Sequence, residues 1–209
     1  MNRIITIGRE FGSGGRELGK RLAEHLTSAY YDKEIIEEIS KRTQLSEQYV
    51  HQIIEQRPGY YHHPITIGRT LHASSADYLV KQHTAVYAEQ ASVLREMAEK
   101  SDCVIVGRCA DYILKECDPL RIFVYADMPC KIKRCREKAE LDEHLSDHEM
   151  KKKILKVDKN RAHYYHYYTG QKWGRHANYD LCINTSQLGF ERTVEVVLDY
   201  MKHKGIQIN

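Results

Sequence analysis

Apolar residues along the chain form two alternating patterns: short continuous runs, and longer stretches in which they recur every three or four positions. The short runs are rich in Ile, Val, Phe and Tyr, as buried strands are, and cover residues 4–7, 29–31, 103–106, 121–125 and 181–184. The periodic stretches predict helices over 16–26, 46–54, 78–100, 128–139, 146–168 (one helix or a pair) and 190–203, and another capped by Asp32. This alternation predicts a three-layer α/β domain with a mostly parallel central sheet.

The first predicted strand leads directly into a glycine-dense loop at the start of a helix. Residues 4–19 read IITIGREFGSGGRELG. Glycines permit backbone conformations in which successive N–H groups turn toward an anion, and the N-terminus of the following helix favours negative charge. We therefore expect a phosphate group to be held by the backbone of Gly12, Ser13, Gly14, Gly15 and Arg16.

The loop departs from the common phosphate-binding motif GxxxxGK[ST] at three positions. Counting back from Gly14, Arg9 stands where the first glycine belongs, Gly15 replaces the lysine, and Arg16 replaces the Ser/Thr that holds Mg²⁺. Because a guanidinium group grips phosphate oxygens with two hydrogen bonds, either Arg9 or Arg16 is a candidate to replace the lysine. The alternative for each is an ordinary surface position.

Further candidate residues follow the second and third predicted strands. Asp32 and Lys33 come after the second strand, and Arg108 and Asp111 come after the third. Ligands of parallel α/β sheets bind beyond the carboxyl ends of the strands, so these residues and the glycine loop are expected to converge. Arg108 follows a buried strand and therefore calls for an anion. Asp32 has the alternative role of a helix cap, and Asp111 that of an ion-pair partner of Arg108.

Four sequence blocks, in order, resemble the cytidylate kinase-like branch of the nucleoside monophosphate kinases. They read ITIGREFGSGGRELG, YYDKEII, VIVGRCADYIL and KVDKNRA, and YDLCINTS follows as the last core strand. The resemblance spans nearly the whole chain. It implies a P-loop NTPase fold in one domain over residues 1–209, with an acceptor-binding insertion at about 40–90 and a lid region at about 134–170.

The resemblance also implies an activity and a set of residues. ATP, with Mg²⁺, would donate its γ-phosphoryl group to a small nucleotide such as CMP. The catalytic residues implied are Arg9 or Arg16 at the loop and Arg134 and Arg161 in the lid, where a solvated basic face is the alternative. The acceptor would be bound by Asp32, Lys33, Arg108, Asp111 and Asp158. No residue is assigned to the metal.

Composition limits the other classes of function. The chain has 209 residues, with 32 basic and 29 acidic side chains and a net charge of +3, a balance that by itself indicates neither nucleic-acid nor membrane binding. No segment approaches the ~20 apolar residues of a membrane span, and the N-terminus lacks the pattern of a signal peptide. Six cysteines without a CxxC pair are typical of reduced thiols. We expect a cytoplasmic protein whose partner is a small nucleotide, with its oligomeric state open.

Two alternatives to an enzyme stay open at this point. A regulatory protein could bind nucleotide in the same loop without turnover, and the missing lysine favours that reading. A nucleic-acid-binding module could use the segment 151–173, where aromatic residues alternate with Lys and Arg. The nearly neutral total charge speaks against the second alternative.

Overall fold

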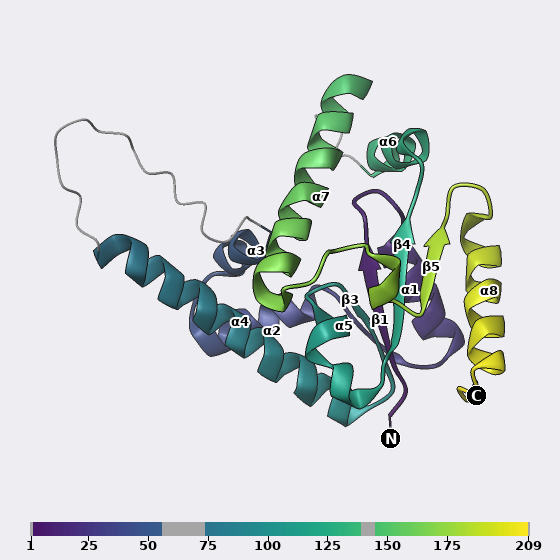
Figure 1. The fold of residues 1–209 in the computed structure, drawn as a ribbon, viewed down its shortest axis with the longest axis horizontal. Coiled ribbons are helices and arrows are strands. Elements are labelled where there is room, and N and C mark those ends of the chain that lie inside the picture. The colour runs from purple at the N-terminus through teal and green to yellow at the C-terminus, as the bar shows by residue number, and fades with distance from the viewer. Residues whose placement is uncertain (1, 56–73, 139–144, 209) are drawn as a thin grey trace.

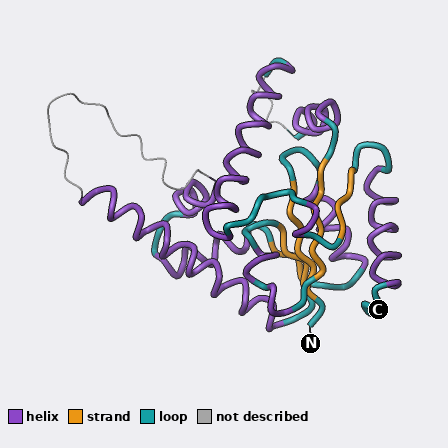
Figure 2. Tube along the Cα trace, viewed as in Figure 1, coloured by secondary structure: helices purple, strands orange, loops and turns teal. Residues whose placement is uncertain are grey.

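A five-stranded parallel sheet forms the centre of the molecule in the computed structural model, which describes residues 2–55, 74–138 and 145–208 (Figures 1 and 2). The strand order is β2-β3-β1-β4-β5, and every neighbouring pair is parallel. The strands are β1 (Ile4–Arg9), β2 (Ala29–Tyr31), β3 (Cys103–Val106), β4 (Leu120–Tyr125) and β5 (Leu181–Asn184). The predicted three-layer α/β class is confirmed, and each predicted strand is present.

The helices follow the predicted periodic stretches to within a few residues. They are α1 (Gly15–His25), α2 (Glu34–Thr43), α3 (Glu47–Glu55), α4 (Ser74–Lys100), α5 (Ala110–Ile113), α6 (Met128–Glu137), α7 (Asp147–Thr169) and α8 (Gly189–His203). The short helix α5 was not predicted, nor were the 3₁₀ turns η1 (Lys115–Cys117) and η2 (His176–Asn178). The stretch 146–168 is one helix rather than a pair. It begins with a capping box, in which the side chains of Ser146 and Glu149 each bond the other's backbone N–H.

Two apolar cores lie on opposite faces of the sheet. Helices α1 and α8 cover one face, and α2, α3, α4, α5 and α7 cover the other. Strand β3 is buried along its whole length because helices cover it on both sides, which explains its continuous apolar sequence. Gly19 lets α1 pack closely on this strand, since a Cβ atom there would lie 3.0 Å from Cγ2 of Val106. The start of α1 is thereby fixed above the carboxyl edge of the sheet.

The two chain ends lie together on the side of the sheet away from the glycine loop (Figure 1). Arg3 near the N-terminus donates a 2.6 Å hydrogen bond to the carbonyl oxygen of Gln207 near the C-terminus. The carboxyl edge of the sheet is the opposite side. The loop after β1, the turn after β3 and helix α7 meet at that edge.

Candidate functional site

Two glycines fix the shape of the loop between β1 and α1. Gly12 and Gly14 have φ angles of 75° and 84°, in the left-handed region that strains other residues. A Cβ atom on Gly14 would overlap the ring of Phe190, and one on Gly12 would lie 2.9 Å from Sγ of Cys135. Both the backbone conformation and the available space therefore require glycine.

Between these glycines, Ser13 anchors the loop to its surroundings. Its hydroxyl group donates to the carbonyl oxygen of Glu10 at 2.8 Å. Its own carbonyl oxygen accepts from Nη1 of Arg134 at 2.8 Å and from Oγ1 of Thr185 at 2.6 Å. The loop is thus held from behind through a carbonyl group.

The first turn of α1 offers N–H groups to an anion. The first bond along this helix runs from the N–H of Leu18 to the carbonyl oxygen of Gly14 at 3.0 Å. The N–H groups of Gly15, Arg16 and Glu17 precede it and have no carbonyl one turn earlier in the helix. Together with the positive end of the helix dipole, they give the geometry that the predicted phosphate cradle requires, and phosphate binding itself stays a prediction.

The side chain of Arg9 fills the space that a side chain at position 15 would need. A Cβ atom on Gly15 would lie 2.5 Å from Cβ and 3.0 Å from Cγ of Arg9. A lysine at position 15 is therefore incompatible with the arginine side chain as it lies. The two departures from the common motif are therefore sterically linked, since the side chain at the end of β1 fills the space beside the start of α1.

The guanidinium group of Arg9 is buried at the carboxyl edge of the sheet. Its Nη2 atom lies 3.8 Å from Oδ1 of Asp32, too far for a hydrogen bond. Gly107 leaves room for it, since a Cβ atom there would overlap the guanidinium group. Burial, together with the charge of Arg161, lowers the pKa of Arg9 to about 9. At neutral pH the guanidinium group is therefore charged, and its surroundings favour the binding of a further anion.

Asp32 binds arginine rather than capping α2. Its Oδ2 atom lies 2.7 Å from Nε of Arg16, whose side chain is 49% exposed. The cap position of α2 is Lys33, and no side chain caps that helix. The helix-cap alternative for Asp32 is therefore wrong. Its Oδ1 atom is buried and has no hydrogen-bond partner among the described residues.

Arg108 lies in an unusual turn after β3. Gly107, Arg108 and Cys109 all have left-handed φ angles, of 77°, 59° and 53°. The buried amide of Gln90 stabilises this turn by donating to the carbonyl oxygen of Arg108 at 2.9 Å. Strained backbone of this kind collects at binding sites, where the surrounding structure holds it in place. The guanidinium group is buried, and its Nη1 atom lies 3.5 Å from Oε1 of Glu55.

Asp111 is not the partner of Arg108. It accepts a 2.7 Å hydrogen bond from the hydroxyl group of Tyr165. Burial raises the pKa of its carboxyl group, and this hydrogen bond opposes the shift. The ion-pair alternative for Asp111 is therefore wrong, and Glu55 takes that place beside Arg108.

Arg161 of α7 joins the same cluster. Its Nε atom lies 3.2 Å from Oε2 of Glu55, and its Nη1 atom donates to the carbonyl oxygen of Arg9 at 3.5 Å. Burial opposes ionisation of Glu55, but the charges of Arg161, Arg108 and Arg9 outweigh it and lower the pKa of this carboxyl group to about 2. The cluster therefore connects α3, α7 and two strand ends through one carboxylate.

Glu55 was missed by the sequence analysis. It is the last residue of α3 and belongs to no recognisable motif. One signal was available: the helical pattern of residues 46–54 places Val50 and Ile54 on the buried side, and an acidic residue follows directly. That signal is too common to identify a site.

The other predicted residues lie at different places. Asp158 accepts from the N–H of Phe11 at 2.6 Å and from Nζ of Lys131 at 3.1 Å, and Lys131 also pairs with Glu10 at 2.6 Å. Asp158 thus connects α7 to the start of the loop. Lys33 is exposed and lines neither of the two cavities described below. Arg134 contacts the loop through Ser13, as described above.

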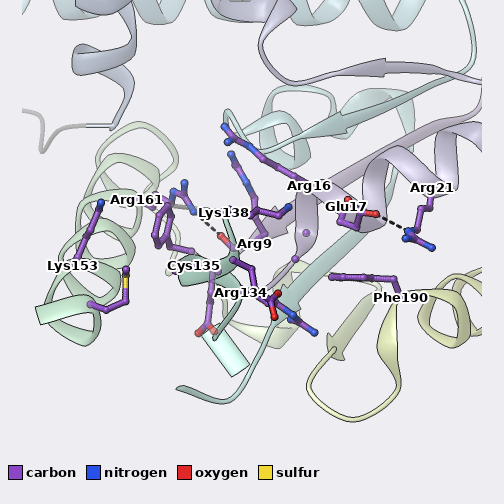
Figure 3. A pocket seen from close by; sticks show the side chains of 17 residues that line it. Arg9, Arg16, Glu17, Arg21, Arg134, Cys135, Lys138, Lys153, Arg161 and Phe190 are labelled. Carbon is purple, nitrogen blue, oxygen red and sulfur yellow. Dashed lines mark hydrogen bonds and ion pairs between the residues drawn. The ribbon is translucent and has the colours of Figure 1, made fainter. Parts of the chain in front are cut away.

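A cavity of about 800 Å³ lies over the glycine loop (Figure 3). This volume falls within the range of small-molecule sites. Figure 3 shows Lys153 and Arg161 of α7 on the far side of the cavity from Phe190. Its cationic lining residues are Arg9, Arg16, Arg21, Arg134, Lys138, Lys153 and Arg161. These cations outnumber the acidic lining residues Glu10, Glu17 and Glu137, so the lining favours a ligand with several negative charges.

A second cavity has a volume of about 40 Å³ and shares Arg9 and Arg161 with the lining of the first. Its other charged lining residues are Glu55, Arg108 and Asp111. Trp173, which is the only tryptophan of the chain, also lines it. The two arginines therefore lie between a large cavity at the loop and a small one at the ends of β1 and β3.

Two features are absent from the described residues. They contain no group of three or more His, Cys, Asp or Glu side chains placed to hold a metal ion. No helix among them has the length and apolar character needed to cross a membrane.

The sheet, the glycine loop and the cationic cavity define a P-loop kinase fold. A solved structure of shikimate kinase from Bacteroides thetaiotaomicron has the same fold, with a TM-score of 0.57 at 16% identity over 97% of this chain and 99% of that one. The chain belongs to the cytidylate kinase-like family, whose sequence model matches residues 4–187. The resemblance stated from the sequence is thereby confirmed.

Two relatives cover almost the whole chain. A protein named cytidylate kinase from Staphylothermus marinus is 24% identical over 200 residues, which are 95% of this chain and 96% of that protein. The crystal structure of an uncharacterized protein from Eubacterium ventriosum has a TM-score of 0.69 and 28% identity, and the match covers 96% of this chain and 98% of the other. Family and fold together support a nucleotide kinase.

Proposed function

We propose that this protein transfers the γ-phosphoryl group of ATP, in the presence of Mg²⁺, to a small acceptor that carries a phosphate group, with CMP as the first candidate. The observation that carries the proposal is the spatial exchange of Arg9 and Gly15. The loop has lost the usual lysine, yet a buried cation takes up the adjoining space. The name of the relative from Staphylothermus marinus supports CMP as the first acceptor to test.

The large cavity would hold the donor. Phosphoryl transfer requires donor and acceptor to be aligned and the charge of the transferred group to be neutralised. The N–H groups at the start of α1 bind phosphate oxygens, and the cationic lining supplies neutralising charge. The amide cradle thus holds the triphosphate, and the rest of the cavity has room for the nucleoside.

Arg9 is the better candidate of the two arginines for the role of the lysine. Its side chain is buried, and its Nη2 atom has no hydrogen-bond partner among the described residues. Arg16 is half exposed, and its Nε atom is committed to Asp32. We therefore assign phosphate binding to Arg9, and the orientation of Asp32 to Arg16.

The buried carboxylate of Asp32, behind Arg9 and Arg16, is the proposed ligand of Mg²⁺. This ion is commonly bound by one or two carboxylates together with phosphate oxygens and water. Asp32 fits the role because Oδ1 is buried and has no hydrogen-bond partner in the described part of the chain. The ion would reduce the negative charge of the phosphate groups. Asp32 would supply the protein's oxygen ligand in place of the absent Ser/Thr hydroxyl group.

Two arginines of the lid region have different roles in this proposal. Arg161 lies between the two cavities and is placed to contact a phosphoryl group passing from one to the other. The Nη atoms of Arg134 donate hydrogen bonds to Ser13 and Thr185, so Arg134 positions the loop.

The resemblance assigns two segments to the acceptor insertion and the lid. Residues 56–73 of the first and 139–144 of the second lie outside the described structure.

A coupled assay of the purified protein with CMP, dCMP, UMP and AMP tests the proposal. We expect ATP-dependent turnover with at least one of these acceptors, and a rise in melting temperature when ATP binds. If calorimetry shows that ATP binds but no acceptor is phosphorylated, the protein is a regulatory nucleotide-binding protein. If ATP neither binds nor is consumed, the proposal fails altogether.

A further inference from the structure

Two buried arginines, Arg9 and Arg108, and the partly buried Arg161 surround one glutamate. Oε1 of Glu55 lies 3.5 Å from Nη1 of Arg108, and Oε2 lies 3.2 Å from Nε of Arg161. Arg9 lines the same small cavity. Charge-assisted hydrogen bonds of good geometry are shorter, at about 2.7–2.9 Å. The carboxylate thus neutralises the arginines without satisfying them well.

The arginines have more donors than Glu55 can accept. Nε and Nη2 of Arg108 are buried and have no hydrogen-bond partner among the described residues. A buried guanidinium group with unused donors is costly, which indicates that another ligand completes it. A terminal phosphate group carries three acceptor oxygens and up to two charges, whereas a carboxylate carries two oxygens and one charge. A phosphate group therefore matches the donors better.

The carboxylate of Glu55 occupies the positions at which a phosphate group would contact these arginines. Its two oxygens lie at Nη1 of Arg108 and at Nε of Arg161. The cavity beside them is small, at about 40 Å³. An anion that binds both of these nitrogens therefore takes the place of the carboxylate.

We propose that Glu55 occupies the subsite of the acceptor's phosphate group in the empty protein, and that a doubly charged phosphate displaces it. The inference rests on the proposed function for the identity of the acceptor, but the binding of the anion needs no turnover. Displacement exchanges one negative charge for two beside three arginines. Glu55 thereby selects acceptors with a doubly charged group over those with a single charge.

The position of Glu55 allows this displacement. It is the last residue of α3, where the negative end of the helix dipole disfavours a carboxylate. The carboxylate is held there by Arg108 and Arg161. An anion that binds these arginines more strongly therefore removes the attraction that holds the carboxylate in place. Released into water, the group recovers its hydration.

Inorganic phosphate is the probe, and two measurements follow its binding. Trp173 is the only tryptophan of the chain, and it lines this cavity and also a third one, beside Lys172 and Arg175. Its fluorescence therefore detects binding near either cavity. A crystal structure with phosphate then shows where the anion lies. We expect phosphate between Arg108 and Arg161, with the Glu55 side chain turned away. Phosphate bound only elsewhere, or bound while Glu55 keeps both arginine contacts, would overturn the inference.

A pair of variants tests the competition in solution. Glu55→Gln removes the charge from the subsite, and we expect phosphate to bind on the order of tenfold tighter, since a unit charge within a few ångströms has at least that effect. Asp32→Asn removes the same charge from the same cluster but outside the small cavity. If both variants gained the same affinity for phosphate, the change in net charge alone would explain the gain, and displacement of Glu55 would be refuted.

The melting temperature of Glu55→Gln, with and without phosphate, is a further test, because a change in net charge alone does not predict how it varies. Without phosphate we expect a lower melting temperature than for wild type, because Arg108 and Arg161 lose their counter-charge. Saturating phosphate should restore it, and by a larger shift than in wild type. An unchanged shift contradicts the inference. If the variant does not fold, the wild-type titration and phosphate complex still decide it. A failed transfer assay together with displaced Glu55 would refute the proposed function alone.

Discussion

The side chain of Arg9 lies in the space where a side chain on Gly15 would begin, with Cβ of the arginine 2.5 Å from the Cβ position of residue 15. The amide cradle of the loop does not depend on the identity of the cation beside it. The proposed replacement of the lysine by Arg9 therefore leaves the shape of the loop unchanged.

Replacement of Arg9 should affect phosphate binding more than replacement of Arg16. We expect Arg9→Ala to lower kcat/KM by about 10²–10³, the usual loss for one group that stabilises transition-state charge. Arg16→Ala should cost less, because its half-exposed side chain acts through Asp32. Steady-state kinetics with ATP as the varied substrate compare the two. Equal, small losses would remove both arginines from the role of the lysine.

Exchange of both positions should recover what a single exchange loses. Gly15→Lys alone places a side chain against Arg9, and overpacking of this kind costs about 1–3 kcal/mol. In Arg9→Gly/Gly15→Lys the space is free again, so the free energy of unfolding should recover. Urea denaturation of the wild type, both single variants and the double variant gives the coupling energy. Additive losses would show that the two side chains do not compete.

The fold was predictable because its strands are short apolar runs that helices cover on both sides. Residues 103–106 are wholly apolar for this reason, and the structure buries all four. The helix α5 was missed because its four residues hold too little periodic signal. Arg108 was predicted as an anion-binding residue from its place after this strand, and that role stays a prediction although the structure buries the side chain.

The remainder of the site depends on contacts between segments far apart in sequence. Glu55 gains its role only where α3, α7 and the turn after β3 meet, and no local pattern encodes that meeting. The two alternatives for Asp32 were equal in sequence, since each needs only a carboxylate at a strand end. The preference for Arg9 over Arg16, which stays a proposal, required the burial of Arg9 and the contact of Arg16 with Asp32.

The Glu55 cluster should make stability depend on pH in a defined direction. The folded-state pKa of Glu55 is about 2, below its ordinary value of 4.5. Its contribution to stability is therefore fully present above about pH 4.5 and is lost as the pH falls toward 2. The difference in unfolding free energy between wild type and Glu55→Gln should shrink over that interval. A constant difference would contradict the lowered pKa.

The buried pair of Tyr165 and Asp111 should be structurally important. Tyr165→Phe leaves the carboxyl group of Asp111 buried without its 2.7 Å donor. Loss of a hydrogen-bond donor from a buried carboxyl group costs about 1–3 kcal/mol, so the variant should lose that much in urea denaturation. The exposed Tyr167 on the same helix offers a control, because Tyr167→Phe should change stability little. Equal effects would show that the hydrogen bond contributes nothing.

Arg134 and Arg136 lie two residues apart on α6 and should differ strongly. Arg134 bonds the carbonyl oxygens of Ser13 and Thr185, each at 2.8 Å, and so supports the loop from behind. Arg134→Ala should raise KM for ATP by about tenfold, the loss of one charge-assisted bond, with a smaller change in kcat.

Arg136→Ala is the matched control for this variant. Arg136 is exposed and pairs with the exposed Asp147 at 2.5 Å, and surface ion pairs contribute about 0–1 kcal/mol. We expect its KM for ATP and its melting temperature to stay close to wild type. If instead Arg134→Ala lowers kcat and leaves KM unchanged, Arg134 contacts the transferred phosphoryl group and its role as a positioning residue is wrong. A split between KM and kcat thus distinguishes support of the loop from catalysis.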